Sequence, residues 1–98
     1  MTELLITEPA RDDLLGIWFY IAESSYLQYA DERLDLILNE CELLTHQPEM
    51  GVERTEVAEG LRCFPVSRYN IYYRYQVDIV IVVHIVAAAQ DIKGIEFL

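Results

Sequence analysis

The order of the sequence patterns predicts a single α+β domain spanning residues 1–98. Over the first half of the chain, apolar residues recur at three- and four-residue steps, as in amphipathic helices. After Gly51 the period changes to two, which is typical of strands. The last such stretch, Ile79 to Ala87, is apolar on both faces and must be covered on both. We therefore expect an N-terminal strand, an antiparallel helical hairpin and a three-stranded antiparallel meander, forming one small sheet in the order β-α-α-β-β-β.

The first two elements are a short strand and a helix. Leu4-Leu5-Ile6 is an apolar run suited to the strand. Thr7-Glu8-Pro9-Ala10 follows with a capping hydroxyl, an early acid and a first-turn proline, which together indicate a helix start. The helical stripe that follows consists of Ala10, Leu14, Ile17, Trp18 and Ile21. Gly16 costs about 1 kcal/mol in a helix interior, so we expect a neighbouring element to approach closely there.

The second helix starts after a break at Ser24-Ser25, where Ser25 and Gln28 have the spacing of a capping box. It ends at His46-Gln47-Pro48, because Pro48 cannot continue it. The short break makes the two helices an antiparallel hairpin. The apolar stripe of this helix consists of Leu27, Ala30, Leu34, Ile37, Cys41 and Leu44.

Three strands are expected after the hairpin. The first runs from Leu61 to Val66, and its Pro65 implies an edge position or a bulge. The second, Asn70 to Tyr75, is rich in aromatic residues. A tight turn at Gln76-Val77-Asp78 leads into the third, Ile79 to Ala87, which we expect to carry the helical hairpin on one side.

The charge of the chain is uneven. Residues 1–60 carry 14 acids against 3 bases, a net −11, whereas residues 61–98 carry 3 acids against 4 bases, a net +1. An overall charge of −10 argues against broad nucleic-acid binding, because phosphate contacts need a cationic surface. The chain has no signal-peptide pattern and no apolar run long enough to span a bilayer, so we expect a cytoplasmic protein that does not bind membranes.

The residue types that carry catalysis or bind metals are not arranged in a recognisable motif. The two cysteines and two histidines lack ligand-like spacing, the four glycines are scattered, and no serine lies in a nucleophile elbow. Cys63 beside Arg62 has the sequence context of an activated thiolate, but a buried strand cysteine is the favoured interpretation. We expect no catalytic residues, no metal and no cofactor.

One group of side chains on the predicted strands is a candidate for binding a phosphate group or an acidic protein surface. Its members lie on adjacent strands, so several could converge on one sheet face. The alternatives are that each arginine pairs with one of the many carboxylates and that the histidine is structural. The candidate target-binding residues are Arg62, Arg68, Tyr73, Arg74 and His84.

The order and spacing of many residues resemble the ParE/RelE superfamily of bacterial toxins, and most closely its ParE-like branch, often called plasmid stabilisation proteins. The resemblance covers nearly the whole chain and rests on the hairpin signature, a P-x-x-G turn and an R-x-F / I-x-Y-R strand pair. These residues are Pro9-Ala10, Asp13-Leu14, Ile17, Tyr20-Ile21, Ser24, Ala30, Leu44, Pro48, Gly51, Gly60-Leu61-Arg62, Phe64, Tyr69, Ile71, Tyr73-Arg74 and Asp91.

The resemblance implies the toxin half of a type II toxin–antitoxin pair, which inhibits DNA gyrase by protein–protein binding. It also implies a cognate ParD-like or similar antitoxin that neutralises the toxin in a hetero-oligomer. Two alternatives remain: a ribosome-dependent mRNA endonuclease of the RelE type, and a non-toxic family member that binds antitoxin. We expect an amphipathic antitoxin segment between the hairpin and the sheet, held mainly by apolar burial. The candidate antitoxin-binding residues are Trp18, Ile21, Leu34 and Ile37.

The chain departs from the family in charge and at its C-terminal end. Such toxins are commonly basic, whereas this chain carries −10. The family has basic residues where this chain has His84 and Gln90, and a histidine at Ala87. The RelE-like nucleases also use a C-terminal tyrosine, and this chain ends Ile95-Glu96-Phe97-Leu98. Cleavage of RNA needs a base, an acid and cationic charge together, so these losses favour a function without catalysis.

Overall fold

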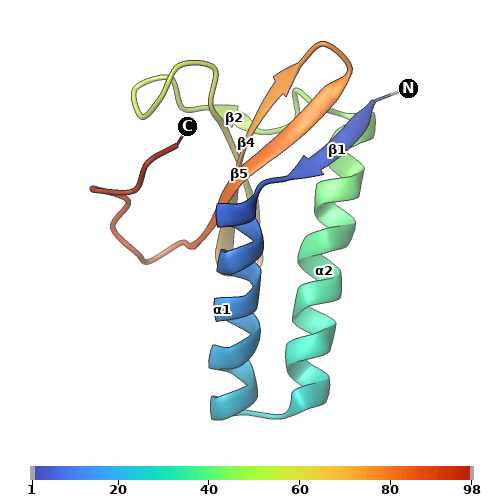
Figure 1. Ribbon diagram of the computed structural model, residues 1–98, viewed down its shortest axis with the longest axis vertical. Helices are drawn as coiled ribbons and strands as arrows, with labels where there is room; N and C mark the ends of the chain where they lie inside the picture. The colour runs from blue at the N-terminus through green and yellow to red at the C-terminus, as the bar shows by residue number, and fades with distance from the viewer. Residues whose placement is uncertain (1, 98) are drawn as a thin grey trace.

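The computed structural model describes residues 2–97, which form a helical hairpin packed on a five-stranded sheet (Figure 1). The strand order is β1-β5-β4-β3-β2, and only β1 and β5 are parallel. The predicted fold class is therefore confirmed. The elements are β1 (Glu3–Ile6), α1 (Glu8–Ser24), α2 (Leu27–His46), β2 (Val52–Glu53), β3 (Arg62–Val66), β4 (Tyr69–Gln76) and β5 (Ile79–Ala87).

The short strand β2 was not predicted, because two residues are too few to show a period. It pairs only with Arg62 and Cys63, at the start of β3. Pro65 lies beyond the reach of β2 and pairs only with Asn70 of β4, so the missing N–H of the proline faces no strand. The predicted edge position of Pro65 is confirmed.

The start of α1 is capped as predicted. The Thr7 hydroxyl accepts a hydrogen bond from the Ala10 amide at 3.3 Å and donates one to the Val82 carbonyl at 2.9 Å. One side chain therefore both begins the helix and ties it to β5. The end of α1 and the tip of the hairpin extend beyond the sheet (Figure 1).

The predicted capping box of the second helix is wrong. Tyr26 is the N-cap residue of α2, and its side chain makes no cap hydrogen bond. Because the helix begins one residue later than expected, Gln28 lies one position too early to reach back to the cap. It donates instead to Glu32 at 3.2 Å.

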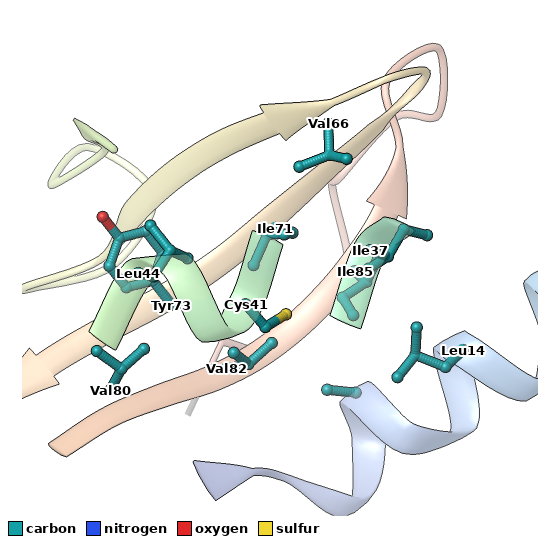
Figure 2. Packing of buried hydrophobic residues seen from close by; sticks show 11 residues of the cluster. Leu14, Ile37, Cys41, Leu44, Val66, Ile71, Tyr73, Val80, Val82 and Ile85 are labelled. Atoms are coloured by element: carbon teal, nitrogen blue, oxygen red, sulfur yellow. The ribbon is translucent and has the colours of Figure 1, made fainter. Parts of the chain in front are cut away.

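The main core lies between the hairpin and the sheet (Figure 2). A shift in register between β4 and β5 pairs Tyr72 with His84 but Tyr73 with Val82. The extra residue on β5 lets Val82 and Ile85, three positions apart, both face the helices. The buried members of this core are Ala10, Leu14, Ile37, Cys41, Leu44, Val66, Ile71, Tyr73, Val80, Val82 and Ile85.

A second, smaller core covers the opposite face of the sheet. Partly buried residues of the β2–β3 loop and of the C-terminal segment pack against it, so both faces of β5 are covered as predicted. This arrangement places residues 92–97 against the sheet, on the face opposite the helices. The buried members are Leu61, Cys63, Tyr72, Val83, Val86 and Phe97.

The close neighbour expected at Gly16 is absent from the described residues. Gly16 is exposed, and a Cβ atom placed on it would meet nothing within 4 Å. The prediction was wrong because a glycine permits the close approach of a neighbouring element but does not require it.

Candidate functional site

Arg62 and Tyr73 hold the loop between α2 and β2. The Arg62 guanidinium donates to the Gly51 carbonyl at 2.8 Å, to the Glu49 carbonyl at 3.2 Å and to the Glu53 carboxylate at 3.2 Å. The Tyr73 hydroxyl accepts from the Gly51 amide and donates to the Pro48 carbonyl, both at 2.8 Å. Both side chains thus form hydrogen bonds with backbone groups of the loop and hold it against the sheet.

Arg74 binds two other segments of the chain. Its guanidinium donates to the Glu59 carbonyl at 3.1 Å and to the Phe97 carbonyl. The Phe97 ring packs on Tyr72, with 4.8 Å between ring centroids. Arg74 therefore fastens both the β2–β3 loop and the C-terminal segment to the sheet.

His84 is oriented by a carboxylate from α1. Its Nδ1 atom lies 2.7 Å from Oδ2 of Asp13, and the same oxygen accepts from the Ile85 amide at 2.9 Å. The His84 ring also makes an edge contact with Phe97 at 5.5 Å between centroids. β1 pairs with β5 only as far as Val82, and Asp13 accepts the hydrogen bond of the Ile85 amide beyond that point. The same carboxylate positions the His84 ring.

The five candidate target-binding residues are not gathered into one cluster. Arg62 and Tyr73 serve the α2–β2 loop, whereas Arg74 and His84 both contact Phe97. Arg68 lies in the turn between β3 and β4 and is exposed. Of the five, Arg68 is the side chain most accessible to a partner, and the role of all five in target binding stays a prediction.

Next to His84 there is a cavity of about 490 Å³ between the start of α1 and the C-terminal segment. A histidine held by a carboxylate is an arrangement that can accept or deliver a proton. Arg62 and Arg74, which would supply cationic charge, are bonded to carbonyl groups elsewhere. The residues that line the cavity are Thr7, Pro9, Val83, His84, Ile95 and Glu96.

The four candidate antitoxin-binding residues lie at different depths. Ile37 is fully buried and Ile21 nearly so, while Leu34 packs partly buried against the main core. Trp18 is half-buried, and its indole N–H donates to Asp31 at 2.8 Å, linking α1 to α2. Their contact with an antitoxin stays a prediction, and in the free chain Ile37 offers no surface to a partner and Ile21 very little.

The two cysteines are buried and free, as expected for structural thiols. Burial raises the pKa of the Cys41 thiol to about 12. Burial also raises the pKa of Cys63, although the nearby Arg54 acts in the opposite direction. Since a reactive cysteine needs a lowered pKa, the activated thiolate considered for Cys63 does not fit the structure.

Among residues 2–97, no three side chains of the histidine, cysteine or acidic types are grouped so that they could hold a metal ion. No helix in that range is both long and apolar enough to cross a bilayer.

A family profile described as "ParE toxin of type II toxin-antitoxin system, parDE" matches residues 4–92. The chain belongs to this ParE toxin family. It is similar to Toxin ParE3 of Caulobacter vibrioides, at 26% identity over 94 residues that cover 96% of this chain and 94% of ParE3.

Among solved structures, the chain is similar to one titled "Chromosomal ParDE TA system from P. aeruginosa". The TM-score is 0.79, and the match covers 89% of this chain and 96% of the other, at 18% sequence identity. At that identity the likeness supports the ParE fold alone. The match of the family profile over residues 4–92 confirms the family resemblance seen in the sequence.

Two residues of the site escaped the sequence reasoning. Asp13 appeared only as part of the family pattern, and Phe97 only as part of a C-terminal stretch that lacks a tyrosine. The signal for Asp13 would have been an acid on the side of α1 that faces the sheet, but its partner His84 is 71 residues away. Nothing in the local pattern connects the two.

Proposed function

We propose that this ParE family member is the toxin of a type II pair, neutralised by a cognate antitoxin in a hetero-oligomer. In its free form the toxin inhibits DNA gyrase in the cytoplasm by binding the enzyme as a protein ligand. The observation that carries the proposal is the family match over residues 4–92. The matched ParE3 of Caulobacter vibrioides is itself named a toxin.

The internal contacts of the basic residues support a function without catalysis. Arg62 and Arg74 are bonded to carbonyl groups of the α2–β2 loop, the β2–β3 loop and the C-terminal segment. Using either one to stabilise a phosphorane would require breaking those bonds. Arg68 is free to make a protein contact on the surface, since its side chain is exposed.

A second candidate, the ribosome-dependent mRNA endonuclease, has one observation in its favour. His84 is held by Asp13 beside the cavity of about 490 Å³, an arrangement suited to general base catalysis. A third candidate is a family member that binds antitoxin and is not toxic, which the high negative charge favours.

Expression of the chain alone from an inducible promoter separates the three candidates. Gyrase inhibition predicts growth arrest, DNA breaks and induction of the SOS response while mRNA stays intact. Cleaved mRNA without DNA damage would support the endonuclease, and normal growth at a verified protein level would support the non-toxic member.

The antitoxin part of the proposal has its own test. The product of the adjoining reading frame is co-expressed with the chain, and the two are expected to co-purify and growth to be restored. Adding the purified chain to a gyrase supercoiling assay then checks the target directly. Full supercoiling activity at a large excess of the chain would refute the gyrase assignment.

A further inference from the structure

One exposed face of α1 carries large apolar side chains. We call the residues Asp12, Leu15, Gly16, Phe19, Tyr20 and Glu23 the outer α1 face. They recur at helical spacing, and all six are exposed. Leu15 is 56% exposed, Phe19 57% and Tyr20 72%. Several large apolar side chains together on one exposed face are typical of an interaction surface.

Gly16 lies in the middle of this face. Glycine is unfavourable in a helix interior, and at Gly16 nothing in the described part of the chain lies within 4 Å of a Cβ position. The glycine therefore has no packing role inside the domain. It exposes the backbone of α1 between Leu15 and Tyr20, where another backbone can approach closely.

A groove of about 430 Å³ continues the outer α1 face toward the end of β5. Gly16 of α1 and Ala87 of β5, two of the smallest residues, both line it, and so does Tyr20. The face and the groove share Asp12, Gly16 and Tyr20, so together they make one exposed surface that carries large apolar side chains. The groove is lined by Asp12, Asp13, Gly16, Ile17, Tyr20, Tyr69, Ile85, Ala87 and Gln90.

The charges on the face determine what kind of partner fits. Asp12 and Glu23 flank the apolar residues, and neither forms an ion pair among the described residues. The two arginines of the hairpin are engaged elsewhere: Arg11 donates to a carbonyl of β1, and Arg33 donates to Ser67 and Tyr29. The face is therefore negative at both ends.

A second copy of the chain would fit this face poorly. Two copies packed along α1 would bring carboxylates against carboxylates, and each chain carries a net charge of −10. An acidic partner would be repelled for the same reason. A cationic segment with an apolar stripe matches both the charge and the apolar residues.

We propose that the outer α1 face is the docking site for a basic amphipathic helix of the antitoxin. The helix crosses α1 at Gly16, its apolar residues contact Leu15, Phe19 and Tyr20, and its Lys or Arg residues lie near Asp12 and Glu23. This inference rests on the proposed function and specifies the partner. It retains the apolar contact expected from the sequence but adds a cationic requirement and moves the contact to the outside of α1.

Gly16→Gln is the first test, with the product of the adjoining reading frame as the probe. The substitution favours the helix, so the variant is expected to unfold at a higher temperature than the wild type. The added side chain blocks close approach, so the dissociation constant is expected to rise by about tenfold or more. Asn39→Gln, at an exposed position of α2, is the matched control and should leave affinity unchanged.

The second test reverses charge. Asp12→Lys with Glu23→Lys is expected to weaken binding by about tenfold and to reduce its dependence on salt. The control is Asp35→Lys with Glu42→Lys, which changes the net charge by the same amount but at exposed positions of α2. This pair should change the affinity by less than about twofold. Equal weakening by both pairs would show a general charge effect and overturn the assignment to α1.

The outcomes separate this inference from the proposed function. Tight binding of the wild type that neither Gly16→Gln nor the Asp12/Glu23 reversal weakens overturns the docking site and leaves the toxin–antitoxin pair intact. A wild-type chain that neither binds the adjoining protein nor arrests growth overturns both.

Discussion

Replacing Gly51 with alanine tests how tightly the α2–β2 loop is packed against the sheet. A Cβ atom at this position would lie 2.6 Å from the Tyr73 hydroxyl oxygen, 2.7 Å from Cε1 of the same ring and 3.0 Å from the Cys63 carbonyl oxygen. Tyr73 is fully buried, so its ring cannot move aside freely. Either the loop or the ring must shift.

The expected loss of stability follows from these contacts. Overpacking of this kind costs about 1–3 kcal/mol. A shift also weakens the two hydrogen bonds of the Tyr73 hydroxyl, each worth about 1 kcal/mol. We expect the free energy of unfolding to fall by about 3 kcal/mol, which in a domain of this size lowers the melting temperature by about 12–24 °C.

Gly16→Ala is the matched control, because the same atom is added where nothing lies within 4 Å. The alanine favours the helix and should raise the free energy of unfolding by about 1 kcal/mol. Urea denaturation followed by circular dichroism measures both variants. A change of less than about 0.5 kcal/mol in Gly51→Ala would refute the packing argument, since surface substitutions give changes of that size.

Further predictions concern the helix cap, the C-terminal segment, a buried thiol and the exposed arginine. Thr7→Ala removes the hydrogen bonds of the hydroxyl with the Ala10 amide and with the Val82 and Val83 carbonyls, and should lower the free energy of unfolding by about 1–2 kcal/mol in urea denaturation. Phe97→Ala should lower the free energy of unfolding by about 3 kcal/mol and make residues 92–96 more accessible to a nonspecific protease; digestion of that segment at the wild-type rate would contradict the packing. Because burial raises the pKa of Cys41 from 9.0 to about 12, its neutral form contributes stability below pH 9, which is lost as the pH rises toward 12. Cys41→Ala should therefore lose less stability than the wild type between pH 8 and 11. Arg68→Glu should abolish growth arrest while leaving the melting temperature within a few degrees; full toxicity would remove Arg68 from the target surface.

The parts of the fold that local chemistry determines were predictable from the sequence. Thr7 caps its own helix, and the stripe that includes Ile37 and Leu44 faces the core. Pro65 lies where no neighbouring strand needs a hydrogen bond from its missing N–H. The helix cap and the apolar stripe depend on residues three or four positions apart, and the place of the proline depends on the proline itself.

The candidate site was less predictable because its partners are distant and often backbone atoms. Arg62 and Arg74 bind carbonyl oxygens, including those of Gly51 and Phe97, and periodicity says nothing about where such atoms lie. His84 depends on a carboxylate 71 residues away. A pattern of residue types therefore identified the chemically important side chains but not the contacts that occupy them.

The order of strands in the sheet has a consequence for synthesis of the chain. β5 is made last, yet it lies inside the sheet between β1, which is made first, and β4. Among the described strands, β5 alone joins β1 to the rest of the sheet, so the sheet cannot be completed before residues 79–87 have been synthesised. A shortened product that lacks residues 79–87 would leave β1 and β4 without the strand that both of them pair with, so the five-stranded sheet could not form.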